Sequence, residues 1–239
     1  MSIFNWLKNR SNNFSLATTS EQIPPYEEGF EQALRFTKSL GYNTTLLSLI
    51  DAETNLLDAN GTFIDPVFYA AGIADRTQSG GQCLKWCHFL QPFFEKHIGK
   101  RVMLTIGQLW KNQHCLFGPT FEDVRRWNKS GLQLKDFEAG GGFKLHAWLT
   151  LESGEIIEPT LLSSLALAGH DSFKKYAGAT VWGRDPSVLN GHRYVPIAVG
   201  NELIENIAER SAIPLLASNL SDLESIHAIL ITEVSSTRK

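Results

Sequence analysis

Residues 145–160 constrain the fold of this chain more than any other stretch. Side chains alternate in character from 145 to 151, before a short Glu-Ser-Gly segment that ends at Gly154, and a second β-like stretch follows at 155–160. Strict alternation is typical of half-buried strands, and a glycine in a short connection is typical of a β-hairpin. We therefore expect two antiparallel strands, at 145–151 and 155–160.

The length of the loop in this hairpin decides the direction of Glu158. A two-residue loop at 153–154 would place Glu158 on the face opposite His146. A three-residue loop at 152–154 needs a glycine in the left-handed conformation at its last position, and Gly154 supplies it. That loop pairs Leu151 with Glu155 and makes Glu158 a diagonal, same-face neighbour of His146. We favour the three-residue loop.

The first strand of the hairpin has two faces of different character. His146, Trp148 and Thr150 share one face because side chains alternate along a strand. The other face is apolar and should pack on the core; it comprises Leu145, Ala147, Leu149 and Leu151. We expect Trp148 to form a wall of the site and to shield an ion pair from water.

Cys83 follows a glycine pair and begins a helical pattern at about 82–97. On the first turn of a helix, unpaired backbone N–H groups and the helix dipole favour the thiolate form of a cysteine. Gly80 and Gly81 would let the backbone approach a substrate closely.

A nucleophilic cysteine also needs donors for the negative oxygen that develops on the attacked carbonyl. Gln78 and Gln82 are the candidate side-chain donors, and the backbone N–H of Cys83 is a third. We prefer Gln78, because a donor upstream of the helix can reach back over the thiol.

Cys83, His146 and Glu158 together supply a nucleophile, a base and a carboxylate that orients the base. Each of them alone is more often an ordinary structural residue. As a set, in this order, they predict a catalytic triad.

The motifs around these residues resemble the transglutaminase-like branch of the papain-like cysteine hydrolase superfamily, and the nearest pattern is the transglutaminase-like protease of lasso-peptide maturation. The resemblance implies an α+β fold in which a nucleophile helix packs on an antiparallel sheet, and thiol acyl chemistry on an amide. It covers about residues 78–160. Glu158 stands where the family mostly has aspartate, and the stretch between Ile106 and Phe143 is longer than in compact members. The matching motifs are Gly81-Gln-Cys83, Thr105-Ile-Gly107, His146-Ala-Trp148 and Gly154-Glu-Ile-Ile-Glu158-Pro-Thr160.

The other two cysteines do not suggest a second site. Cys87 lies one turn after Cys83 and should pack in the core, and Cys115 lies in an expected loop. Cys83, Cys87 and His88 do not provide four ligands at a metal-binding spacing, so we expect no metal site.

The rest of the chain predicts further helices at 26–40, 119–128, 201–210 and 221–232, and a buried strand at 102–110. Residues 140–142, all glycine, should form a hinge. We divide the chain into an N-terminal arm at 1–25, a catalytic core at 26–165 and a C-terminal extension at 166–239 with extra helices.

Composition limits the class of protein. The net charge is −3 and no dense Lys/Arg cluster occurs, which argues against a nucleic-acid partner. Three cysteines do not make a disulfide framework. No apolar run is long enough to span a membrane, and the first residues do not resemble a signal peptide. The default location is therefore cytoplasmic, with non-classical secretion left open.

We expect a cysteine-dependent hydrolase or acyltransferase that acts on an amide or peptide bond of a protein or peptide and needs no cofactor. Peptidase, deamidase and transglutaminase activity all remain open, as does the oligomeric state. One alternative is a catalytically inactive scaffold that binds proteins. Another is acetyl transfer of the arylamine type, which ranks lower because no phosphate-binding glycine loop or basic cluster for acetyl-CoA is evident.

Overall fold

Six antiparallel strands form one open sheet around a long central strand, β1 (Val102–Lys111). One edge of β1 pairs with β8 (His192–Val199). The other edge pairs first with β5 (His146–Leu151) and then with β2 (His114–Phe117), so that β5 and β2 lie end to end along β1. Beyond β5 follow β6 (Ile156–Glu158) and β7 (Val181–Gly183). The computed structural model describes residues 16–50, 55–138, 142–169, 171–184 and 191–225.

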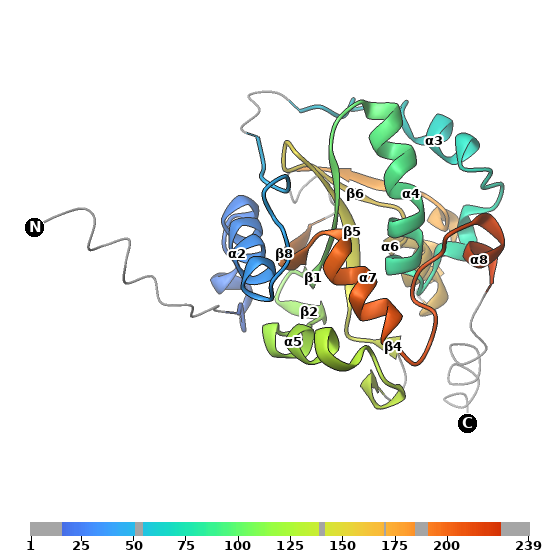
Figure 1. The fold of residues 1–239 in the computed structure, drawn as a ribbon. Coiled ribbons are helices and arrows are strands. Elements are labelled where there is room, and N and C mark those ends of the chain that lie inside the picture. Colours follow the sequence, from blue (N-terminus) through green and yellow to red (C-terminus); the bar gives the residue numbers. More distant parts are fainter. Residues whose placement is uncertain (1–15, 51–54, 139–141, 170, 185–190, 226–239) are drawn as a thin grey trace, which may run out of the picture.

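Helices cover both faces of this sheet (Figure 1). On one face α2 (Tyr26–Ser39) packs its Phe30 and Ala33 against Met103 of β1 and Val199 of β8. The opposite face is covered by α4 (Cys83–Ile98), with three helices around it: α3 (Ile64–Ala70), α5 (Phe121–Ser130) and α7 (Asn201–Glu209).

Shorter elements complete the described fold. They are α6 (Leu161–Leu167), α8 (Leu220–Glu224), the 3-10 turns η1 (Ser20–Gln22), η2 (Arg76–Ser79), η3 (Leu134–Asp136) and η4 (Asp171–Tyr176), and a small ladder of β3 (Phe137–Glu138) with β4 (Gly142–Phe143).

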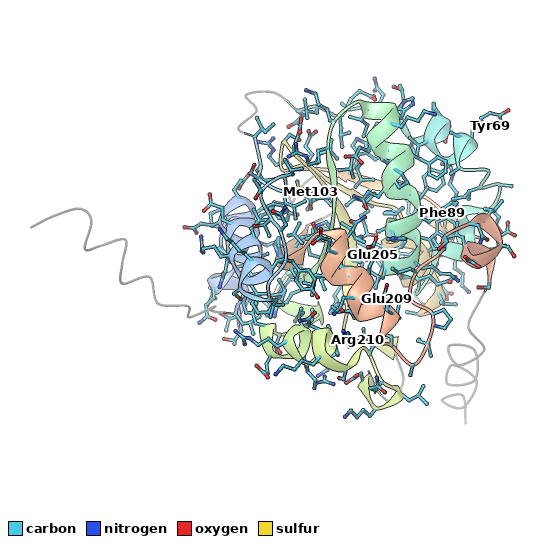
Figure 2. The ribbon with its side chains drawn as sticks, viewed as in Figure 1. Tyr69, Phe89, Met103, Glu205, Glu209 and Arg210 are labelled. Atoms are coloured by element: carbon cyan, nitrogen blue, oxygen red, sulfur yellow. The ribbon has the colours of Figure 1, made fainter. Side chains whose placement is uncertain are left out.

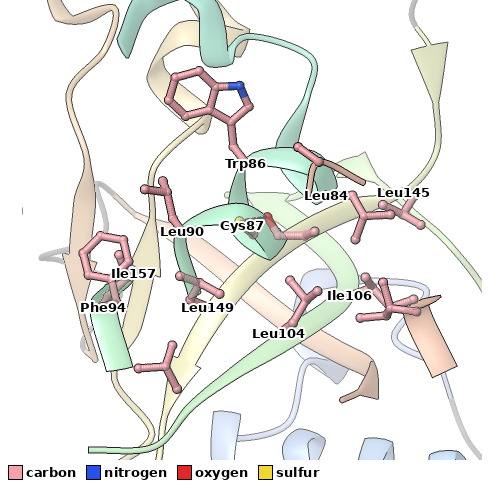
Figure 3. Packing of buried hydrophobic residues seen from close by; sticks show 14 of the residues in the cluster. Leu84, Trp86, Cys87, Leu90, Phe94, Leu104, Ile106, Leu145, Leu149 and Ile157 are labelled. Atoms are coloured by element: carbon pink, nitrogen blue, oxygen red, sulfur yellow. Dashed lines mark hydrogen bonds between the residues drawn. The ribbon is translucent and has the colours of Figure 1, made fainter. Parts of the chain in front are cut away.

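The main core lies between α4 and the sheet (Figure 3). Along α4, residues spaced by three or four positions turn inward, because that spacing puts them on one helix face. Leu84, Cys87, Leu90 and Phe94 are all buried there. The apolar face predicted for β5 meets them, since Leu145, Ala147, Leu149 and Leu151 belong to the same cluster. Gly99, with φ 67°, ends α4 in the left-handed conformation.

The predicted register of the hairpin is confirmed. Leu149 pairs with Ile157 and Thr150 with Ile156, and the N–H of Leu151 donates to the carbonyl of Glu155 at 2.8 Å. Gly154 has φ +86°, as the three-residue loop requires. Glu158 therefore lies on the same face as His146.

Several expectations need correction. The boundary drawn at residue 165 does not divide the structure, because β7 and β8 come from the predicted C-terminal extension and belong to the main sheet. The long stretch between Ile106 and Phe143 is also part of the main fold, because its helix α5 contributes Phe121, Val124 and Trp127 to the main core.

The predicted helices are otherwise found as α2, α5 and α7, but α8 ends at Glu224, Ser225 is extended, and residues 226–232 of the predicted helix lie outside the described residues. The same holds for residues 1–15 of the expected arm and for residues 140 and 141 of the expected hinge. In the described ranges, no helix has the length and the hydropathy needed to cross a membrane.

Candidate active site

Cys83 is the first residue of α4, as predicted. Its side chain is partly buried, and its Sγ lies 3.9 Å from the carbonyl oxygen of Leu145, directly before β5. The thiol also lies close enough to the imidazole of His146 to raise the pKa of the ring. Helix α4 and the hairpin thus bring the two predicted residues together.

His146 is buried at the start of β5, opposite Gly107 of β1. A Cβ at position 107 would lie 2.1 Å from the carbonyl oxygen of Val195 and 2.8 Å from the ring of Trp148. Gly107 therefore lets β8 and the Trp148 ring close in on this part of the sheet. The imidazole is held in a packed environment rather than in solvent.

Glu158 completes the predicted set. Its Oε2 lies 2.5 Å from Nε2 of His146, and its side chain is fully buried. Its Oε1 accepts hydrogen bonds from the backbone N–H and hydroxyl of Thr160, at 2.9 and 2.8 Å, and from the N–H of Leu161, at 3.2 Å. Because Glu158 takes Nε2, the ring nitrogen left for Cys83 is Nδ1. The longer glutamate thus reaches the imidazole while three donors fix its other oxygen.

These contacts set the protonation of His146. Burial alone would lower the pKa of His146, but the charge of Glu158 and the hydrogen bonds to Cys83 and Glu158 raise it from 6.5 to about 10. The imidazole is therefore positively charged at neutral pH. Cys87, one turn along α4, contrasts with it: burial raises the pKa of this thiol well above its usual value, and its Sγ lies 3.5 Å from the carbonyl of Ala147.

Phe117 is a site residue that the sequence did not suggest. Its ring stacks on the imidazole of His146, with centroids 4.9 Å apart and planes 18° apart. The topology explains this contact. Phe117 pairs with Leu109 and His146 with Gly107, two positions along β1, so both side chains emerge on one face where β2 and β5 meet.

Trp148 shields the imidazole of His146 on the side that faces α2. It is fully buried, its ring centroid lies 6.0 Å from that of His146, and its Nε1–H donates to the hydroxyl of Tyr26 at 2.9 Å. The hydroxyl of Tyr26 bonds in turn to that of Thr150 at 2.6 Å. Trp148 therefore forms a buried wall beside the imidazole and is not exposed to a cleft, because α2 covers this face.

Tyr194 of β8 is a further aromatic neighbour, with its ring 6.2 Å from the imidazole of His146. Burial, reinforced by the charge of Glu158, raises the pKa of Tyr194 well above its usual value. Its hydroxyl stays neutral, so it adds no charge to the site.

The two glycines before Cys83 contact α6. A Cβ at Gly80 would lie 2.9 Å from the carbonyl oxygen of Ser163, and the N–H of Gly81, whose φ is +71°, donates to Oγ of Ser164 at 3.0 Å. Their small size thus allows a close approach to a helix of the protein itself. This close approach fixes the start of α4 beside α6, which follows Glu158 in the sequence.

The two predicted oxyanion glutamines make other contacts. Gln78 is exposed, and its amide donates to Asp75 at 3.4 Å. Gln82 is buried; its amide donates to the carbonyl of Gln78 at 2.9 Å and accepts from the ammonium of Lys85 at 3.4 Å. By contrast, no backbone acceptor for the N–H of Cys83 is found among the described residues.

The remaining candidates for metal or thiol chemistry lie apart from this set. His88 contacts the carbonyl of Ala217 and the carboxylate of Glu205, and Cys115 is exposed. In the described part of the chain, no group of three or more His, Cys, Asp or Glu side chains has an arrangement that could hold a metal ion.

Comparisons of the chain with protein-family models, with curated proteins and with solved structures find no match. The case for a function therefore depends on the geometry of Cys83, His146 and Glu158.

Proposed function

We propose that this protein is a cysteine-dependent hydrolase or acyltransferase that acts on an amide or peptide bond. The observation that carries the proposal is that the His146 imidazole interacts with the Cys83 thiol and is hydrogen-bonded to the Glu158 carboxylate. These three groups come from α4, β5 and β6, and the first lies at a helix start. A nucleophile, a base and an orienting carboxylate in contact are what thiol acyl chemistry requires.

In the proposed mechanism the thiol proton resides on His146, which the Glu158 carboxylate holds in the charged form. The Cys83 thiolate attacks the carbonyl carbon, and the imidazolium then gives its proton to the leaving amine. A thioester to Cys83 remains. Water as the second acceptor gives hydrolysis or deamidation, and an amine gives transglutamination.

The backbone N–H of Cys83 is the best supported donor for the developing oxyanion, because it lies beside the thiol and has no acceptor among the described residues. Gln82 is the nearest side-chain amide in sequence, and its rotation toward the substrate would require it to leave the carbonyl of Gln78. We keep Gln78 as a weaker candidate, because its side chain bonds to Asp75.

The fold proposed for this function is papain-like, of the transglutaminase-like type. What supports it is the order of the elements: a nucleophile helix packed on an antiparallel sheet whose neighbouring strands carry the histidine and the carboxylate. The proposed substrate is a protein or peptide, and the proposed location remains cytoplasmic.

The experiment that tests the proposal measures the rate at which iodoacetamide alkylates Cys83 from pH 4 to 10. A Cys115→Ser background removes the exposed thiol, while Cys87 is buried and inert. The usual pKa of a thiol is about 8.5. We expect fast alkylation that persists well below that pH. His146→Gln should abolish the low-pH reaction. His88→Gln, which changes a histidine on the same helix as Cys83, is the matched control and should leave it intact.

Turnover is tested with β-casein, a protein with extended, accessible segments. Peptide release, ammonia release and incorporation of dansylcadaverine distinguish peptidase, deamidase and transglutaminase activity, and each should be lost in Cys83→Ser. A thiol that titrates normally and ignores His146 would overturn the enzyme proposal in favour of the binding scaffold.

A further inference from the structure

A second site lies against the outer side of β7, the last strand of the sheet. A cavity of about 970 Å³ is lined there by all three residues of β7, by Thr180 directly before the strand and by Arg184 directly after it. Its volume is at the upper end of the range for ligand pockets, which is about 300–1,000 Å³. Neither Cys83 nor His146 lines it.

The outer edge of β7 is unpaired in the described part of the chain. β6 occupies one edge, through the pairs Ile156 with Gly183, Ile157 with Trp182 and Glu158 with Val181. No backbone hydrogen bond joins the other edge to any described segment. An open strand edge presents N–H and C=O groups to which another extended chain can add.

Buried polar atoms without partners lie at both ends of this edge. The hydroxyl of Thr180, a residue only 7% exposed, has no hydrogen-bond partner, and neither does the Nε–H of Arg184. Leaving a buried polar atom without a partner is unfavourable, so a ligand that supplies one gains free energy. Four residue steps of a strand separate the two positions, or about 13 Å. One extended backbone of four to five residues is long enough to span the two positions.

The charges around the cavity favour an uncharged occupant. Arg184 makes no ion pair among the described residues, and the carboxylate of Glu155 lines the same cavity. Both oxygens of Glu155 are already engaged, by the N–H groups of Leu56 and Leu57 and by the hydroxyl of Ser153. The positive charge of Arg184 and the negative charge of Glu155 cancel. A neutral carbonyl oxygen is therefore a better partner for Arg184 than an added carboxylate, which would leave a net negative charge. The walls are apolar and aromatic, from Leu162, Tyr176 and Trp182.

We propose that this cavity binds an extended, uncharged and largely apolar peptide segment, which adds as a strand to the free edge of β7 between Thr180 and Arg184. The segment belongs to the protein substrate, and that part of the proposal rests on the proposed function. The cavity shares elements with the catalytic site: Val181 pairs with Glu158, and Leu162 precedes Ser163, against whose backbone Gly80 packs. A bound segment would thus hold its protein next to the catalytic elements.

The test uses the full chain with Cys83→Ala, so that no turnover is needed. A phage library of random twelve-residue peptides is selected against this protein, and the enriched peptide is made with a fluorescein label for anisotropy measurements. We expect enriched peptides with several apolar residues and few charges. Their binding should slow hydrogen exchange at the amides of β7.

Variants locate the binding. Ala59→Trp fills the cavity from an exposed position and should weaken binding more than tenfold. Thr180→Val keeps the shape but removes the unpartnered hydroxyl, and should weaken binding about 3- to 10-fold. Tyr176→Ala removes a half-exposed wall residue and should weaken binding, whereas Tyr69→Ala should not. Tyr69 projects from α3 into solvent and does not line the cavity, which makes it the matched control (Figure 2).

Failure to enrich any peptide would overturn the proposal. So would enrichment of charged peptides, equal affinity for the Ala59→Trp protein, or unchanged exchange at β7. Because binding is read without Cys83, the outcome is independent of the proposed function: an ordinary thiol titration would remove the enzyme and leave the peptide site in place.

Discussion

Replacing Glu158 by glutamine should leave the fold intact and disable the base. The glutamine has the size of the glutamate, but only one end of its amide can accept hydrogen bonds. Three donors, from Thr160 and Leu161, point at Oε1. They should therefore hold the amide oxygen, which turns the NH2 group toward Nε2 of His146.

This orientation reverses the proton arrangement on the imidazole. Nε2 must then accept a hydrogen bond, so the ring becomes neutral with its proton on Nδ1, the nitrogen that faces Cys83. An imidazole in that tautomer cannot take the thiol proton, and the wrong tautomer in a comparable triad lowers kcat about 10⁴-fold. We expect a loss of turnover of about 10³–10⁴-fold.

The effect on alkylation at pH 6 can be worked out. A thiol with a pKa of about 8.5 is only ~0.3% ionised at pH 6, which removes thiolate ~300-fold relative to a full ion pair. The more basic thiolate is intrinsically more reactive, which recovers about tenfold. The Glu158→Gln protein should therefore react with iodoacetamide about 30-fold more slowly at pH 6, and about tenfold faster at pH 10, where its thiol is ionised.

Glu158→Asp is the matched control, since it keeps the charge and shortens the reach by one methylene. It should retain more of the pH 6 reaction than the glutamine variant. A Glu158→Gln protein that is folded by circular dichroism and still reacts at the original rate at pH 6 would refute the role assigned to this carboxylate.

Three further predictions concern pH, packing and the aromatic contact. Folding raises the pKa of His146 from 6.5 to about 10, so its contribution to stability is complete below pH 6.5 and is lost as the pH rises toward 10. The free energy of unfolding in urea should therefore decline more steeply from pH 7 to 10 in the wild type than in His146→Gln. Parallel declines in the two proteins would contradict the raised pKa. Gly107→Ala should lower the free energy of unfolding by more than about 2 kcal/mol, because its Cβ meets backbone at 2.1 Å. The control is Gly118→Ala, whose Cβ meets only the side-chain sulfur of Cys115 and which should change the free energy of unfolding little. Equal effects of the two substitutions in urea unfolding would be inconsistent with this packing. Phe117→Leu should slow alkylation of Cys83 at pH 6 about 3- to 10-fold, because the ring that stacks on His146 is lost, and should leave the circular dichroism spectrum unchanged. An unaltered rate would show that the stacked ring does not hold the imidazole in place.

The hairpin could be predicted from sequence because its determinants are local. A glycine that tolerates φ +86° at the last loop position fixes the loop length, and the loop length fixes which side chains share a face. The contact between His146 and Glu158 follows from that register. The position of Cys83 was equally local, since a glycine pair precedes a helical pattern.

The contacts that depend on distant segments were not accessible in this way. Phe117 reaches His146 only because β2 and β5 lie end to end along β1, and nothing within either segment indicates this pairing. The role of β8 beside β1 was missed for the same reason, and with it the true extent of the sheet. Trp148 alternates onto the face of His146 as expected, but only the position of α2 shows that this face is covered.

The glycines show how a correct residue can be assigned an incorrect reason. From the sequence, Gly80 and Gly81 suggest a close approach to substrate, whereas in the structure Gly80 approaches the backbone of Ser163 and Gly81 donates to Ser164. A sequence shows where a Cβ is absent, but it does not show which neighbour uses the space.

The charge state of the His146 imidazole is the most direct test of the account. Nitrogen NMR of protein labelled with ¹⁵N in histidine reports the protonation of each ring nitrogen, and the His146 signals are assigned by their loss in His146→Gln. The account predicts that both nitrogens carry a proton at pH 7 and that the ring titrates near 10, with a lower pKa in Cys83→Ala. A His146 ring that is neutral at pH 7 and titrates near its ordinary value, with or without Cys83, would contradict the ion pair on which the proposed chemistry depends.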